Sequence, residues 1–196
     1  MRKIHSLRAR QEGVVLLIAL IVLVAMSLAG VALIRSVDTS ITVAGNLAFS
    51  QSAVQSGDRG IVEAAKWLEA KNTGPALSNT DEVNGYYAST PNPEPDWHDM
   101  GSWTGASKVV NGGTPDASGN VVRYVIHRMC ANVGSWNGNP CARAPGPLGA
   151  AGQSQTTTAV PFEGTPLLFY RITSRVDGPR NTVSVVQSSV LLPVPD

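Results

Sequence analysis

One unbroken apolar run dominates the first third of the chain. From Val14 to Ile34, 21 consecutive residues carry no charge. A helix rises ~1.5 Å per residue, so this run would reach roughly 30 Å, the thickness of the hydrocarbon core of a bilayer. We therefore expect a helix that can span a membrane.

Apolar residues recur at helical spacings beyond this run, with polar residues between them. They are Ile34, Val37, Ile41, Ala44, Ala48, Val54, Ile61, Ala65 and Leu68. Spacings of three, four and seven predict an amphipathic helix with one apolar face. The Lys-Asn-Thr-Gly-Pro segment at 71–75 is a typical helix end, so the helix should run from Val14 to about Asn72.

Glycines are the weak points of this long helix. Each costs up to ~1 kcal/mol relative to alanine in a helix interior. We expect a kink near Gly45 and Asn46, or a break between Gly57 and Gly60.

The last third of the chain alternates with the period of a strand. Residues 168–176 and 184–192 place apolar and polar side chains on opposite parities, and a turn at 177–181 separates them. Residues 121–129 alternate in the same way, with His127 on the polar, solvent-facing parity. The pattern predicts an α+β fold, in which the long N-terminal helix packs on an antiparallel β-sheet head of at least three strands.

The segments between these elements are rich in glycine, proline and polar residues. Within residues 74–118, Trp97, His98, Asp99 and Trp103 lie close together in the sequence. One histidine and one adjacent carboxylate cannot complete a closed metal site, so we expect aromatic packing of a long loop against the head. Residues 143–158 have few core side chains, and we expect an exposed loop there.

Composition and motifs exclude several functions. The net charge of +1 gives no reason to expect nucleic-acid binding. No serine has nucleophile-elbow spacing, and no glycine-rich phosphate loop is present. We therefore expect neither an enzyme nor a bound cofactor or metal.

Charge and cysteines indicate export. Basic residues crowd the first ten positions, whereas Arg35 alone follows the apolar run, so the N-terminus should be cytoplasmic. Three alternatives remain: a signal peptide cut after Ala29, an uncut anchor, or a leader ending at Gly13. In an oxidising compartment Cys130 and Cys141 would form a disulfide worth roughly 2–3 kcal/mol; two reduced thiols are the alternative.

Several of these segments together resemble a known family. The opening Gln11-Glu12-Gly13 with its apolar run, the stretch from Arg35-Ser36 to Ala44-Gly45-Asn46, and the closing hairpin at 170–188 are similar to type IV prepilins. Type II secretion pseudopilins are relatives of these prepilins. Within the combined group, the segments look most like minor pilins of the PilX type. The resemblance covers the first ~70 and the last ~30 residues.

The resemblance implies a processed N-terminus. Prepilin peptidase would cut after Gly13, and Val14 would become the N-methylated first residue. Residues 1–13 would be the leader, 14–73 the helix with 14–34 transmembrane before assembly, and 74–196 a periplasmic or extracellular head. The chain departs from the usual prepilin pattern at Glu12, where a basic residue is common, and at Val14, where phenylalanine is usual.

Ile18 is a further departure, because most pilins carry glutamate at the fifth mature position. That carboxylate is costly in an apolar filament core unless it is paired, and its partner is thought to be the terminal ammonium of the subunit above. A subunit with nothing above it has no such partner, which favours a place at or near the tip. In the alternative interpretation, Ile18 merely completes a membrane anchor.

The resemblance thus implies a minor pilin that helps initiate pilus assembly and supports adhesion and twitching motility. Its partners would be prepilin peptidase, other minor pilins and pilus subunits, and the inner-membrane assembly platform, with a tip adhesin as a further candidate. It would sit in the inner membrane as a single-pass protein and then in the pilus on the cell surface. The alternatives are a membrane-tethered periplasmic binding module and a type II secretion minor pseudopilin.

Overall fold

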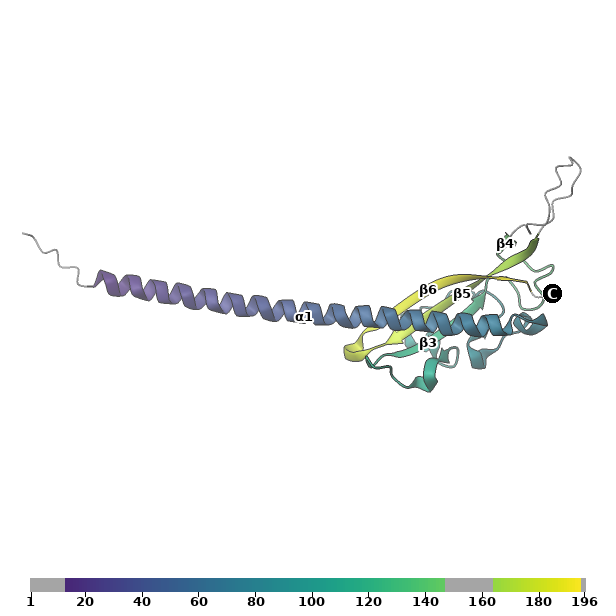
Figure 1. The fold of residues 1–196 in the computed structure, drawn as a ribbon, viewed down its shortest axis with the longest axis horizontal. Coiled ribbons are helices and arrows are strands. Elements are labelled where there is room, and N and C mark those ends of the chain that lie inside the picture. The colour runs from purple at the N-terminus through teal and green to yellow at the C-terminus, as the bar shows by residue number, and fades with distance from the viewer. Residues whose placement is uncertain (1–12, 147–163, 195–196) are drawn as a thin grey trace, which may run out of the picture. The chain divides into compact units, whose positions relative to one another are not determined.

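A single long helix forms the N-terminal part of the protein. The computed structural model describes residues 13–146 and 164–194, and helix α1 runs from Val14 to Lys71 over 58 residues (Figure 1). Its end confirms the helix stop predicted at residues 71–75. Contacts divide the chain into two units, residues 1–47 and residues 48–196, which we describe separately.

The first unit is a helix with an apolar surface. Every large apolar side chain from Val14 to Leu47 is 45–76% exposed, and this part of α1 is a candidate membrane span by length and composition. Four of its hydroxyl groups form hydrogen bonds within the helix. Ser27, Thr39, Ser40 and Thr42 each donate to the carbonyl four residues earlier, at 2.8–2.9 Å. Hydroxyl groups that donate to carbonyls of their own helix need no water, which suits a helix in a membrane.

The second unit contains a six-stranded sheet built around β5. Its strands are β1 (Tyr86–Tyr87), β2 (Lys108–Val109), β3 (Val121–Arg128), β4 (Arg143–Gly146), β5 (Gly164–Asp177) and β6 (Val183–Pro193). Short 3₁₀ helices connect them: η1 (Gly74–Ser78), η2 (Glu82–Asn84), η3 (Met100–Trp103), η4 (Val110–Gly113) and η5 (Pro179–Asn181). Strand β5 pairs antiparallel with β3, β4 and β6.

The predicted hairpin and the strand at 121–129 are confirmed. In the hairpin, Asp177 pairs with Val183 and Leu167 with Pro193, and η5 forms the turn. One prediction about the sheet is wrong, because it is mixed rather than purely antiparallel: β1 runs parallel to β3. A parallel pair needs a long connection, and residues 88–120 provide one.

Part of the predicted 143–158 loop is instead a strand. Residues Arg143 and Ala144 of β4 pair with Leu168 and Leu167 of β5. The remainder of that loop, like residues 1–12 of the predicted leader, lies outside the described residues. A proline within β4 fits its place beside the end of β5, because prolines in sheets are confined to edges and strand ends.

Small residues form the face of α1 that packs on the sheet. The buried positions are Ala53, Ser56, Gly57, Gly60, Ala64 and Leu68. A Cβ added at Gly60 would overlap the side chains of Ser174 and Val122. At Gly57 it would come within 2.9 Å of the Val186 side chain. The helix backbone therefore lies almost directly on β3, β5 and β6 (Figure 1).

One prediction about α1 is wrong and another holds only in part. The helix continues unbroken through Gly45, Gly57 and Gly60. Of the predicted apolar face, Leu68 is buried and Ile61 and Ala65 pack against the core, whereas Val54 is 44% exposed. A pattern search weighted towards large apolar residues misses a face on which close approach requires glycine, alanine and serine.

Residues 87–107 cover the opposite face of the sheet. Trp103 from this segment is buried, and so are Val125, Thr173 and Arg175 on the strands beneath it. His127 is only 5% exposed, so its predicted solvent-facing position is wrong. Alternation of apolar and polar residues implies exposure of one parity only where that face of a sheet is open.

We predict that Gly60→Ala destabilises the head. The new methyl group must displace Ser174 or Val122, and overpacking of this kind costs about 1–3 kcal/mol against a helix-propensity gain of up to about 1 kcal/mol. Thermal unfolding of the full chain in detergent should show a lower Tm. The matched control is Gly45→Ala, which has open space around it and should leave the Tm unchanged or raise it. A Gly60→Ala variant as stable as Gly45→Ala would contradict the packing.

Candidate functional site

The residues singled out at the N-terminus lie on the first turns of α1. Gly13 immediately precedes the helix, and its carbonyl accepts the first helical hydrogen bond, from the backbone N–H of Leu17 at 3.3 Å. Val14 and Ile18 are 62% and 54% exposed. Four residues apart, they share one side of the helix. The first turn contains no acidic residue, so nothing on it balances the positive end of the helix dipole.

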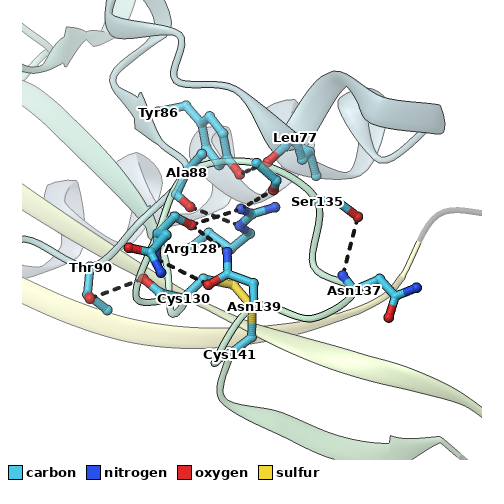
Figure 2. The surroundings of a disulfide bond; sticks show 12 residues. Leu77, Tyr86, Ala88, Thr90, Arg128, Cys130, Ser135, Asn137, Asn139 and Cys141 are labelled. Atoms are coloured by element: carbon cyan, nitrogen blue, oxygen red, sulfur yellow. Dashed lines mark hydrogen bonds between the residues drawn. A yellow bond between two sulfur atoms is a disulfide. The ribbon is translucent and has the colours of Figure 1, made fainter.

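A disulfide joins Cys130 to Cys141 and closes the loop between them. Figure 2 shows that this loop is also held by hydrogen bonds. The backbone N–H of Thr90 donates to the Cys130 carbonyl at 2.8 Å, and the Asn139 side chain donates to the Asn132 carbonyl at 2.6 Å. The covalent bond and these contacts together attach the loop to the end of β3.

Arg128, beside the disulfide, was not anticipated from the sequence. It is 2% exposed and donates to three carbonyl groups, those of Ala88 at 3.0 Å, Gly134 at 2.6 Å and Asn132 at 3.4 Å (Figure 2). Two of the three carbonyls belong to the disulfide loop. Arg128 therefore ties that loop to the segment after β1, and its charge is compensated by dipoles rather than by a carboxylate.

Buried tyrosines lie near this guanidinium. Tyr86 donates its hydroxyl to the Leu77 carbonyl at 2.6 Å, and burial raises its pKa well above the usual value. Burial likewise raises the pKa of Tyr170 to about 12, although the Arg128 charge opposes the shift. Both phenols therefore stay protonated at any physiological pH, and they serve as neutral core residues.

A second polar cluster joins α1 to the loop before β3. Asn120, which is buried, donates to the hydroxyls of Ser52 and Ser56 at 3.0 Å each, and Ser56 donates to Asp116 at 2.6 Å. Burial raises the pKa of Asp116, but the hydrogen bonds from Ser56 and from the Asn120 and Ser118 backbones outweigh it and hold the pKa below its usual value. These groups satisfy one another, so the cluster is structural.

An aromatic cavity of about 230 Å³ opens on the side of the sheet away from α1. Its walls include Tyr87, Trp97 and His127, and Ser89, Thr90 and Ser102 also line it. The Tyr87 ring stacks on His127 with centroids 5.1 Å apart, and Trp97 meets His127 edge-on at 5.8 Å. We refer to this space as the aromatic cavity.

Trp97 is fixed in place from several directions. Its indole N–H donates to Glu94 at 2.7 Å, and Glu94 pairs with Arg171 of β5 at 2.9 Å. Arg175 donates to the Trp97 and His98 carbonyls at 3.3 and 2.7 Å. The wall of the aromatic cavity is therefore anchored to β5 through two arginines.

The predicted aromatic packing around Trp97 and Trp103 is present in the structure. The two rings meet edge-on with centroids 5.3 Å apart, and Trp103 donates to the Trp97 carbonyl at 3.0 Å. His98 and Asp99 are exposed and do not line the aromatic cavity. Among the described residues, no group of three or more histidine, cysteine or acidic side chains could hold a metal ion.

His127 is neutral in the folded protein. Burial and the Arg171 charge, which Glu94 only partly opposes, together lower its pKa to about 4. Its Nδ1 is buried and has no hydrogen-bond partner in the part of the chain that the structure describes. Periodicity could not reveal this site, because the residues that meet here come from separate segments of the sequence.

Comparison with known proteins does not assign the chain to a family. No protein-family model matches it, and neither a curated protein nor a solved structure shows significant similarity to it. The function must therefore be inferred from the residues of this chain.

We predict that the stability of the head falls between pH 7 and pH 5 through His127. The unfolded state, with a histidine pKa near 6.5, binds a proton in this range, whereas the folded state, with a pKa of about 4, does not. At 1.36 kcal/mol per pH unit, the loss at pH 5 is about 2 kcal/mol. Urea unfolding of the full chain in detergent should show this loss, and His127→Phe should reduce it.

The exposed His98 provides the matched control for this measurement. His98→Gln should keep the pH dependence of the parent protein, because His98 lies outside the aromatic cavity. Equal pH slopes for His127→Phe and the parent protein would show that His127 is not the titrating group.

Proposed function

We propose that this chain is a minor pilin that helps initiate type IV pilus assembly and is incorporated at or near the pilus tip. The observation that carries the proposal is helix α1. It begins directly after Gly13, exposes an apolar surface up to Leu47, and packs on a mixed β-sheet through its last two dozen residues. A subunit that leaves a membrane for a filament core requires such a helix.

The internal hydrogen bonds of the first unit support this role. A helix that moves from lipid to protein contacts must not depend on either environment for its polar groups. The hydroxyls of Ser27, Thr39, Ser40 and Thr42 meet that condition, since each is bonded within α1. The exposed large apolar side chains from Val14 to Leu47 can then pack against lipid or against neighbouring helices.

Ile18 supports the position near the tip. A carboxylate on an apolar helix costs a few kcal/mol unless a partner neutralises it. With Ile18 on the same side as Val14, the first turns carry no acidic group that needs a partner above. A subunit with no neighbour above it is stable in that position.

A membrane-tethered periplasmic binding module is the second candidate function. The aromatic cavity favours it, because a head built to bind needs a concave site. The two candidates differ in what happens at Gly13: a pilin is cut there and can leave the membrane, whereas a tethered module keeps residues 1–13. A type II secretion minor pseudopilin would be cut in the same way but would not enter surface pili.

We predict that the mature protein begins at Val14. Mass spectrometry of the protein purified from the membrane should give an N-methylated Val14 terminus. A Gly13→Ala variant should keep the leader and fail to enter pili, because the peptidase reads this glycine. A terminus at Met1 would instead support the tethered module, and a terminus just after Ala29 a secreted domain.

We also predict that Ile18→Glu impairs pilus initiation. An unpaired carboxylate costs a few kcal/mol in the apolar assembly, enough to lower the number of surface pili at least ~10-fold. Pili would be counted by electron microscopy in cells whose membranes contain equal amounts of parent and variant. Ile18→Leu is the matched control and should retain normal numbers. Normal priming by Ile18→Glu would remove the support that Ile18 gives to the tip position.

A further inference from the structure

We infer that the aromatic cavity binds a single neutral saccharide ring. The inference extends the proposed function, since a minor pilin near a tip would present this site to surfaces, and it concerns only the head. The site is built from Tyr87, Trp97 and His127, with the hydroxyls of Ser89 and Ser102 at its lining.

The size of the aromatic cavity favours one ring. Its volume of about 230 Å³ lies below the ~300–1,000 Å³ of pockets that enclose drug-sized ligands. Aromatic side chains present apolar faces against which the C–H face of a sugar ring can pack. Tyr87 and Trp97 supply two such side chains.

The charges around the aromatic cavity favour a neutral ligand. No ionised side chain is among its lining residues, and His127 is uncharged above a pKa of about 4. The nearby Glu94 and Arg171 neutralise each other in an ion pair of 2.9 Å. A charged ligand would leave water without gaining a counter-charge, which is costly.

The polar groups of the lining favour a polyhydroxylated ligand over an apolar ring. Ser89 and Ser102 line the aromatic cavity and are partly exposed, so a ligand can reach their side-chain hydroxyls. A prolyl or phenyl ring covering these groups would leave them unpaired, at a cost of about 1–3 kcal/mol each. Sugar hydroxyls can donate to them and accept from them.

The site is also preorganised. Trp97 is held by Glu94 through its indole N–H, and Tyr87 donates its hydroxyl to the Ala106 carbonyl at 3.1 Å. Trp103 lies buried beside Trp97 and supports it. Walls fixed before binding reduce the ordering cost that a small ligand must offset.

The test is a titration of the full chain, purified in a detergent without a sugar headgroup. Glucose, galactose, mannose and N-acetylglucosamine would each be added while tryptophan fluorescence and saturation-transfer NMR are recorded. We expect weak, saturable binding of at least one of them. Absence of saturable binding for all four would overturn the inference.

Variants then locate the binding site. Trp97→Ala and Ser102→Leu should each weaken binding at least ~10-fold, the first by removing a wall and the second by filling the cavity. Ser102 is partly exposed, so its variant tests the site even if Trp97→Ala unfolds. Trp136→Ala is the matched control, because Trp136 is also partly exposed and lies outside the aromatic cavity.

Two further outcomes would overturn the inference. One is sugar binding that both variants leave unchanged, and the other is tighter binding of a diproline peptide than of any of the four sugars. The assay uses the purified chain, so it gives its result whether or not the protein enters pili. Failure of the proposed function in cells and failure of this inference are thus distinguishable.

Discussion

The close approach of α1 to the sheet at Gly57 and Gly60 is the constraint on which the rest of the head depends. With no side chain at these positions, the helix backbone lies against Val186, Ser174 and Val122. That approach leaves room for hydroxyl contacts as well, and Ser56 reaches Asp116 from the same face. The sheet is thereby covered on one side by a helix whose packed face consists mostly of glycine, alanine and serine.

The second face of the sheet follows from a different constraint. Arg171 and Arg175 on β5 point away from α1. Arg171 pairs with Glu94 of the 87–107 segment, whereas Arg175 pairs with Asp177 of its own strand and also donates to the Trp97 and His98 carbonyls of that segment. The loop that satisfies these charges also brings Trp97 over His127. The aromatic cavity is thus a consequence of how the buried Arg175 and the half-buried Arg171 bond to this segment.

The sequence predicted the parts of the fold that depend on local pattern. Helix α1, the hairpin of β5 and β6, and the Cys130–Cys141 disulfide could each be inferred from periodicity, turn residues or compartment. The parallel pairing of β1 and the burial of His127 could not, because both depend on where a long connection returns. Ordinary helix rules also mispredicted Gly57 and Gly60, since those rules count the cost of glycine and not the contact it permits. Cleavage at Gly13 and the role of Ile18 stay predictions.

The three carbonyls around Arg128 couple the core of the head to the oxidation state of two cysteines. Two of them, from Asn132 and Gly134, are presented by the loop that the disulfide closes. When Cys130 and Cys141 are reduced, only hydrogen bonds hold this loop, and the carbonyls that it presents to the guanidinium are less firmly fixed than that of Ala88. A positive charge without its dipoles opposes burial, so oxidation of the two cysteines also favours burial of the guanidinium. The disulfide thus stabilises a charged core residue that it does not itself contact through a bond.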